Sequence, residues 1–462
     1  MAGTARCLAW VGAGMLALAG VAVAGPGSVL PAGAVSTAGP SAAAATWAAV
    51  TSPDPGSESN LAGVSCAAAG CWAVGAEAGS GGIEVPLTEV NTGSGWTEVS
   101  SPVVGGTLDG VSCPTATACV AVGAQGSASR WGAPLAERYS AGGWAAVPTP
   151  ATSSGNGDLA AVVCVTGSDC WAAGAQVTSS DGTVHAPLVE HYNGSTWSIA
   201  AAGSADGVLD GISCITADDC WAAGYQVAAG NQTGLLEQFT GSGWSIVGST
   251  GVAPVDGIAC LTASRCWAVG QDVIEQGGSG FWTVASRPSG LLTGVTCVPG
   301  LAECWAVGIG ATADVLVERY AAGGWTQSTV SDPHPSGFKA AELEGVACAG
   351  SAECVAVGST SETVSGGSSG QTLVEQYQVA PTSPTSAGTP SPTPTATPTP
   401  PAAPSPTPAS SPAPPAGTTS GPLSTRTAQA AFPWPVVLVV VIVVLLVAAG
   451  GWLVVRRRST HR

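Results

Sequence analysis

One short stretch occurs seven times in the sequence and sets what the chain can fold into. Its clearest copy is residues 209–214, Leu-Asp-Gly-Ile-Ser-Cys, followed after five residues by Cys-Trp-Ala-Ala-Gly at 220–224. The first cysteines of successive copies are 47, 51, 50, 46, 37 and 51 residues apart. A repeat of this length is typical of a β-propeller, in which each repeat forms one four-stranded blade.

Four short β-prone segments separated by glycine-rich turns can be located in each repeat, for example 108–113, 266–270, 187–192 and 244–247. The fourth segment begins at a tryptophan that occurs seven times, at Trp47, Trp96, Trp144, Trp197, Trp244, Trp282 and Trp325. Trp47 precedes every cysteine pair, and no such tryptophan follows the last pair. The sequence therefore predicts an all-β, seven-bladed propeller over residues 46–379, closed by an N-terminal strand that completes the last blade and removes exposed sheet edges.

Fourteen of the 15 cysteines form seven close pairs, which indicates an oxidising compartment. The pairs are Cys66 and Cys71, Cys113 and Cys119, Cys164 and Cys170, Cys214 and Cys220, Cys260 and Cys266, Cys297 and Cys304, and Cys348 and Cys354. We expect each pair to form a disulfide between the first two strands of a blade, where cross-strand neighbours are within disulfide range. A zinc site would favour gaps of two to four residues and often histidine, so we expect no metal and no cofactor.

The repeats resemble those of kelch-type β-propellers, in which glycine ends the second strand, tyrosine ends the third and tryptophan follows on the fourth. Gly174, Tyr192 and Trp197 match this pattern, although the family's paired glycine is single here. The chain is still more similar to the Cys-x5-Cys-Trp-Ala-Val-Gly repeats of secreted actinobacterial proteins. That resemblance implies the fold but no activity, because the group has none assigned.

The segments outside the repeats predict a surface protein. Residues 1–24 have the basic start, apolar centre and small-residue end of a signal peptide. A disordered stretch is expected over 25–45, and a semi-rigid Pro/Thr/Ser-rich stalk over 380–431. Residues 436–455 form an apolar run long enough for a transmembrane helix, and the arginines in the 456–462 tail predict a cytoplasmic C-terminus. The expected location is therefore the cell membrane, with one span and the propeller outside.

The charge of the chain argues against nucleic acid as a partner. All 29 acidic residues lie between positions 54 and 375, a span that holds only six basic residues. Such a surface repels phosphate backbones. A plainer interpretation is that the acidic residues keep a secreted domain soluble.

Residues that recur in every blade are expected to be framework, and function is expected where the blades differ. A glutamate recurs on the third strand, at Glu89, Glu137, Glu190, Glu237, Glu275, Glu318 and Glu375. The longer loops lie on the face opposite the cysteines, which makes that face the candidate binding surface. Near its centre the first strand varies, and four of seven positions are acidic: Asp109, Asp210, Asp256 and Glu344. These acids could form a site for a cation or an amine, or they could be independent turn caps and solvated carboxylates.

No catalytic residue is assigned. The repeat region has three histidines and a partner for each cysteine, so it lacks the constellation of a kelch-type copper oxidase, and it lacks the arginine cluster of a sialidase. We expect a binding or adhesion module for a glycan, peptide or cell-wall ligand. The alternative is an extracellular polysaccharide hydrolase or lyase that uses carboxylates of the loop face.

Overall fold

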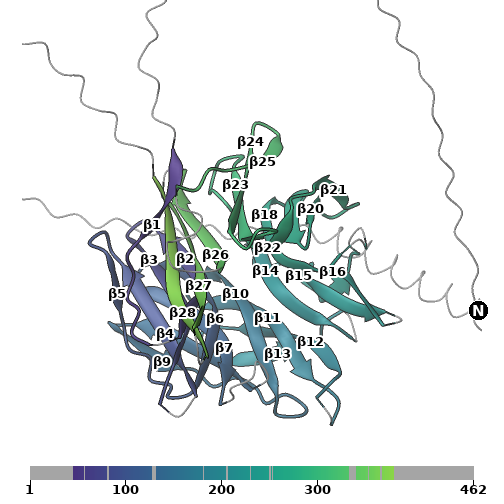
Figure 1. The fold of residues 1–462 in the computed structure, drawn as a ribbon. Coiled ribbons are helices and arrows are strands. Elements are labelled where there is room, and N and C mark those ends of the chain that lie inside the picture. Colours follow the sequence, from purple (N-terminus) through teal and green to yellow (C-terminus); the bar gives the residue numbers. More distant parts are fainter. Residues whose placement is uncertain are drawn as a thin grey trace, which may run out of the picture. The chain divides into compact units, whose positions relative to one another are not determined.

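The structure is a computed structural model that describes residues 45–378 apart from 57, 81–82, 127–131, 181, 204–205, 229, 249–250, 252, 332–339, 352 and 365–366. These residues belong to the first of two units into which the chain divides, Met1–Ser386. They form seven antiparallel four-stranded sheets, each a blade of one propeller (Figure 1). The predicted all-β, seven-bladed fold is confirmed.

We number the blades 1 to 7 in chain order, and each has four strands from the centre outward. The inner strands are β2 (Ser59–Ala67), β6 (Gly106–Thr115), β10 (Gly157–Thr166), β14 (Val208–Thr216), β18 (Val255–Thr262), β22 (Gly290–Cys297) and β26 (Ala340–Gly350). The second strands are β3 (Gly70–Ala78), β7 (Ala118–Gln125), β11 (Asp169–Val177), β15 (Asp219–Ala228), β19 (Arg265–Gly270), β23 (Cys304–Gly310) and β27 (Glu353–Val364). The third strands are β4 (Glu84–Asn91), β8 (Ala133–Ser140), β12 (His185–Tyr192), β16 (Asn231–Phe239), β20 (Val273–Gly277), β24 (Val315–Ala321) and β28 (Gly367–Gln378). The outer strands are β5 (Trp96–Glu98), β9 (Gly143–Ala146), β13 (Trp197–Ala200), β17 (Trp244–Ile246), β21 (Thr283–Ser286), β25 (Gly324–Gln327) and β1 (Thr46–Val50).

The ring closes where the sequence predicts it to close. Strand β1 pairs antiparallel with β28, with Trp47 opposite Tyr377, and so supplies the outer strand of blade 7. Figure 1 shows this first strand, in purple, beside the yellow-green strands at the end of the repeat region. Because β26 also contacts β2, the inner strands form a continuous ring.

Tryptophans of the second strands fill the junctions between blades. Trp72 of blade 1 packs against Tyr139 and Trp144 of blade 2, with ring centroids 4.3 and 5.2 Å away. The same arrangement joins blade 6 to blade 7, where Trp305 meets Tyr377 and Trp47. Trp72 and Trp305 are buried, so they act as interblade packing rather than as a platform for a sugar.

All seven predicted disulfides are present, each within one blade. Their Cα–Cα distances are 4.0 to 4.1 Å, and each joins the end of an inner strand to the start of the second strand. From blade 1 to blade 7, Cys66 bonds to Cys71, Cys113 to Cys119, Cys164 to Cys170, Cys214 to Cys220, Cys260 to Cys266, Cys297 to Cys304, and Cys348 to Cys354. Each bridge therefore closes a short hairpin at the end of the blade opposite to the longer loops.

The remaining predicted segments are 1–24, 25–45, 380–431, 436–455 and 456–462, and they lie outside the described residues apart from Ala45. Within the described ranges there is no helix of the length and apolarity needed to cross a membrane.

A candidate binding cavity at the centre of the propeller

Every inner strand contains a one-residue register shift at the variable position singled out in the sequence. In blade 2, Leu108 and Gly110 pair with adjacent residues of β7, so Asp109 is the extra residue of a β-bulge. The seven bulged residues are Ala62, Asp109, Ala160, Asp210, Asp256, Thr293 and Glu344. A bulge re-aims the side chain that it carries. All seven of these residues line one cavity on the axis of the propeller.

A glycine follows the bulge in six blades because neighbouring inner strands approach closely there. A Cβ atom on Gly63 would lie 2.9 Å from the carbonyl oxygen of Asp109 in the next blade. A Cβ atom on Gly345 would lie 2.9 Å from the carbonyl oxygen of Ala62, which continues the same contact across the ring closure. Blade 3 has Ala161 at this position. The glycine of the Leu-x-Gly pattern is therefore explained by the close contact between the backbones of neighbouring inner strands.

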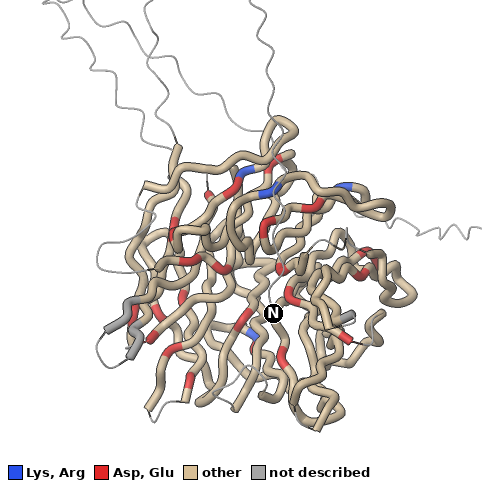
Figure 2. The backbone as a smooth tube through the Cα atoms, turned by 45° about the vertical axis from the view of Figure 1, so that its right-hand side comes forward, with Lys and Arg blue, Asp and Glu red and all other residues tan. Residues whose placement is uncertain are grey.

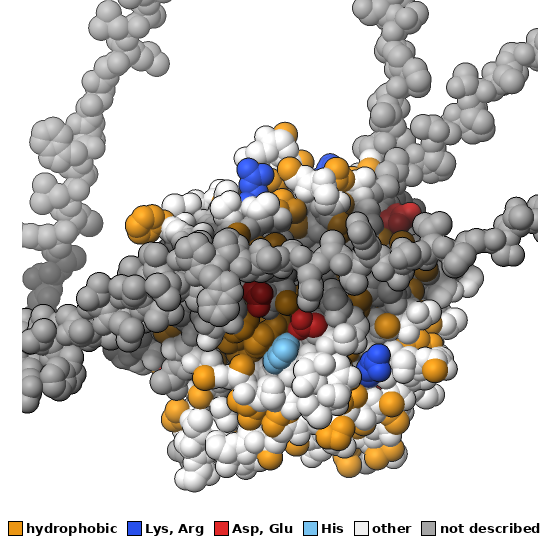
Figure 3. All heavy atoms as spheres, turned by 180° about the vertical axis from the view of Figure 1, so that it is seen from behind, with side chains coloured by type: hydrophobic (Ala, Val, Ile, Leu, Met, Phe, Trp, Pro, Cys, Tyr) orange, Lys and Arg blue, Asp and Glu red, His pale blue; other side chains and the backbone are white. Residues whose placement is uncertain are grey.

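The central cavity has a volume of about 690 Å³ and a strongly acidic wall. Six acids line it: Glu84, Asp109, Asp210, Asp256, Glu342 and Glu344. None of the described residues that line it is Lys, Arg or His. Figure 2 shows how few Lys and Arg residues the described blades carry, and Figure 3 shows acidic side chains on one face beside apolar side chains and a histidine. A cavity of this volume and charge suits a small cationic group.

A ring of branched apolar side chains lines the same cavity, two residues beyond the bulges. Its members are Val64, Val111, Val162, Ile212, Ile258, Val295 and Val346. Two residues of strand correspond to roughly 6–7 Å along the axis, toward the disulfide end. The cavity therefore combines an acidic tier with an apolar tier.

Among the predicted site residues, Glu344 has a pKa that is raised by its surroundings in the cavity. Burial, with smaller contributions from the neighbouring Glu342 and Asp109 carboxylates, raises the pKa of Glu344 to about 7. The hydroxyl group of Thr107 lies 3.5 Å from Oδ2 of Asp109. The structure thus brings all four predicted acids to one cavity, and it adds Glu84 and Glu342.

The recurrent glutamates of the third strands do not line this cavity. Glu137 is buried in blade 2 and accepts a 2.7 Å hydrogen bond from the hydroxyl group of Ser101. Glu237 accepts a 2.8 Å hydrogen bond from the backbone N–H of Gly203. Both donors lie in the loop between the outer strand of the preceding blade and the inner strand of the glutamate's own blade. These two glutamates are therefore part of the framework, in agreement with the interpretation of their recurrence.

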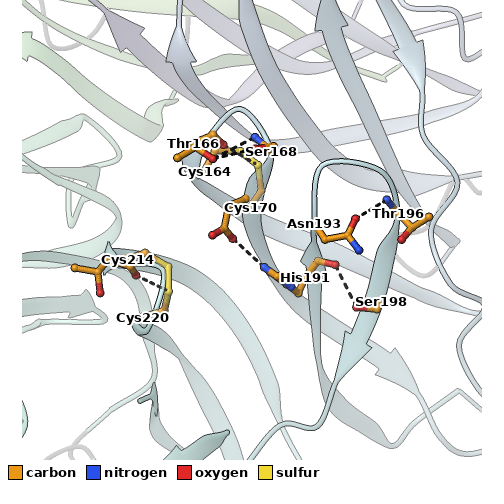
Figure 4. A network of polar contacts seen from close by, with 12 residues as sticks. Cys164, Thr166, Ser168, Cys170, His191, Asn193, Thr196, Ser198, Cys214 and Cys220 are labelled. Atoms are coloured by element: carbon orange, nitrogen blue, oxygen red, sulfur yellow. Dashed lines mark hydrogen bonds and ion pairs between the residues drawn. A yellow bond between two sulfur atoms is a disulfide. The ribbon is translucent and has the colours of Figure 1, made fainter. Parts of the chain in front are cut away.

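At the disulfide end, polar groups bond to one another. His191 Nε2 lies 2.8 Å from Asp169 Oδ1 (Figure 4). The His191 ring also stacks on Trp171, with the ring centroids 4.3 Å apart. Asn193 accepts the N–H of Thr196 and so caps the turn into β13. Across the described ranges, no three His, Cys, Asp or Glu side chains are grouped closely enough to hold a metal ion.

Sequence reasoning missed three parts of the site. The bulge was not foreseen, nor were Glu84, which comes from the start of β4, and Glu342, which lies two residues before the bulge of blade 7. A signal for the bulge was present, because the variable position always precedes a glycine or alanine that a regular buried strand does not require.

Comparison with known proteins supports the fold and no more. No known family and no curated protein matches the sequence. Among solved structures, U3-55K matches with a TM-score of 0.50 and 6% identity over 72% of this chain and 98% of its own. YCF48 bound to D1 peptide matches with a TM-score of 0.48 and 12% identity, and the match covers 72% of this chain and 96% of its own. The RRP9 WD40 repeats match with a TM-score of 0.49 and 6% identity, and that match covers 72% of this chain and 97% of its own. The kelch-like type of the repeat and its similarity to the actinobacterial repeats stay predictions from the sequence.

Proposed function

We propose that this protein is a cell-surface binding module whose ligand places a cationic group in the central cavity. The observation that carries the proposal is the cavity wall, which gathers six carboxyl groups from five strands with no described basic residue among them. A glycan with amino groups, a basic peptide or an amino-bearing cell-wall component would each supply such a cation. Carboxylates within a restricted cavity attract cations more strongly than carboxylates on an open surface, because less water screens them.

The proposed location is outside the cell, on a membrane anchor. A disulfide in every blade supports an oxidising compartment, and the sequence predicts the signal peptide and the 436–455 span. The kelch-like type of the repeat is also proposed, on the recurrence of the Gly-Tyr-Trp pattern. Proteolysis of intact cells tests the topology: release of the propeller by an external protease is expected, and full protection would contradict it.

An array of glycans, peptides and cell-wall polymers, probed with the full-length chain, tests the binding function. We expect retained ligands to carry amino or guanidinium groups, and we expect retention to fall at least tenfold in the variant with Asp109→Asn, Asp210→Asn, Asp256→Asn and Glu344→Gln. A ligand whose retention is unchanged in this variant would place the binding surface elsewhere. Far-ultraviolet circular dichroism of the variant verifies that its blades are folded.

One observation favours a polysaccharide hydrolase or lyase as the second candidate. Glu344 has a pKa of about 7, and its carboxylate neighbours Asp109 and Glu342 contribute to that rise. A protonated carboxyl group beside an ionised one is the arrangement that glycosidases use as acid and base. Release of reducing ends from a polysaccharide, abolished by Glu344→Gln, would support this function over simple binding.

A further inference from the structure

The acids of the central cavity are divided into two groups on opposite walls. In ring order, the bulged residues of blades 7, 1 and 2 are Glu344, Ala62 and Asp109, while those of blades 4 and 5 are Asp210 and Asp256. In a ring of seven blades, the point opposite blade 1 falls between blades 4 and 5. The two groups therefore face each other across the axis.

The additional acids strengthen one group only. Glu342 belongs to blade 7 and Glu84 to blade 1, so both join Glu344 and Asp109. We call Glu84, Asp109, Glu342 and Glu344 the near group, and Asp210 and Asp256 the far group. Both groups line the same cavity.

The walls between the two groups are neutral at the level of the bulges. Blade 3 presents Ala160, and blade 6 presents Thr293. The Thr293 hydroxyl donates a 2.7 Å hydrogen bond to the carbonyl oxygen of Leu343, so it is engaged within the protein. The charge of the cavity is thus concentrated at two ends of one diameter.

The near group is crowded enough to need a positive charge. Repulsion from Glu342 and Asp109 adds to the effect of burial in raising the pKa of Glu344, so three carboxyl groups of this wall lie close enough to repel one another. A cation at this wall would relieve that repulsion. Independently of the charges, the ring of seven valine and isoleucine side chains offers an apolar surface beyond the two groups, toward the disulfide end of the same cavity. An alkyl chain would be stabilised there because its apolar area is removed from water.

We propose that the cavity binds a linear aliphatic diamine or polyamine, with one ammonium group at the near group, another at the far group, and the alkyl chain across the apolar tier. This inference rests on the proposed function, because it specifies the cation that the cavity takes. A metal ion does not fit the arrangement, since the acids lie on opposite walls and the described residues bring no three of them together as ligands. A ligand with a single ammonium group would satisfy one wall only.

Isothermal titration calorimetry of the full-length chain at physiological salt tests the proposal with matched probes. The probes are 1,8-diaminooctane, 1,4-diaminobutane, spermidine and the monoamine n-octylamine. We expect at least one di- or polyamine to bind tenfold or more tightly than n-octylamine, with one molecule bound per chain. Preference for one spacing among the diamines is expected, because the two walls are a fixed distance apart.

Variants separate the contributions of the two walls. Asp210→Asn with Asp256→Asn removes the far group, and Asp109→Asn with Glu344→Gln weakens the near group. Each double variant should lower the affinity for the best diamine to that of n-octylamine. The affinity for n-octylamine should fall by a smaller factor than the affinity for the diamine. The matched control is Asp218→Asn with Glu353→Gln, which removes two exposed acids from the disulfide end and should leave diamine binding unchanged.

The outcomes distinguish this proposal from the proposed function. Equal affinity for n-octylamine and every diamine, lost when the cavity acids are replaced, would overturn the bridging of two walls and keep the cationic cavity. Loss of binding in the control as well would show attraction to net charge alone and overturn both proposals. Absence of binding for all four amines would overturn the diamine proposal, while the array would still judge the proposed function with larger ligands.

Discussion

Trp47, in the first strand of the chain, lies directly opposite Tyr377 in the last, with ring centroids 5.6 Å apart. Trp47 is fully buried, and its ring also makes an edge contact with Trp305 of blade 6. One residue thus joins the beginning of the propeller to its last two blades. The ring depends on this contact because β1 is the outer strand of blade 7.

Replacing Trp47 is expected to destabilise the whole propeller. Trp47→Ala should lower the free energy of unfolding by about 3–5 kcal/mol, the usual cost of truncating a buried aromatic side chain. Urea denaturation followed by tryptophan fluorescence measures the loss. Ala49→Ser, at an exposed position of the same strand, should change stability by less than about 0.5 kcal/mol. Wild-type stability of the Trp47→Ala variant would mean that β1 does not close the ring.

Each disulfide is expected to contribute a similar and modest amount. The bridged residues are only 5 to 7 positions apart, so the entropy removed from the unfolded chain corresponds to about 2 kcal/mol per bridge. Cys164→Ala with Cys170→Ala should therefore lower the free energy of unfolding by about that amount and leave the fold intact. Non-reducing peptide mapping of the wild-type chain should recover only pairs within blades. A pair between blades would contradict the structure.

Much of this architecture could be predicted from the sequence because it repeats. Counting the seven tryptophans identified Trp47 as part of the closing strand, and the close spacing of each cysteine pair favoured a bridge across one hairpin. The bulges were missed, because the glycine or alanine after each variable position indicates a close backbone contact without showing that Asp109 is the extra residue of a register shift. Glu84 was equally hidden, because it reaches the cavity from a third strand whose start the repeat pattern does not define.

The buried Glu89 and Glu190 are expected to make stability depend on pH. Both side chains are fully buried, neither carboxyl group has a hydrogen-bond partner among the described residues, and desolvation is the main cause that raises the pKa of each to about 8. The folded protein therefore holds these protons more tightly than the unfolded chain, whose glutamates titrate near 4.5. The stability that these groups contribute should be fully present below about pH 4.5 and should be lost as the pH rises toward 8.

The slope of the free energy of unfolding against pH measures this effect. Each group adds at most about 1.4 kcal/mol per pH unit between those limits. Urea denaturation at pH 5, 6, 7 and 8 should show a smaller decline in the Glu190→Gln variant than in the wild type. In Glu137→Gln the slope should change less than in Glu190→Gln. The reason is that hydrogen bonds from Ser101 and from the Val103 backbone counteract the rise that burial causes in the pKa of Glu137. An identical slope in wild type and Glu190→Gln would show that Glu190 is ionised in the folded protein.

The glycines beside the bulges are expected to be less tolerant of a methyl group than glycines of open turns such as Gly143. In Gly63→Ala, the new Cβ atom would lie 2.9 Å from the Asp109 carbonyl oxygen and 3.1 Å from the Cα atom of Gly110, both backbone atoms of the next blade. Because a backbone in a closed ring cannot shift without moving its neighbours, we expect Gly63→Ala to lower the free energy of unfolding by about 1–3 kcal/mol. Gly143→Ala is the control, since a Cβ atom there meets nothing within 4 Å. If the two variants were equally stable, the inner strands would not be packed as closely as the ring requires.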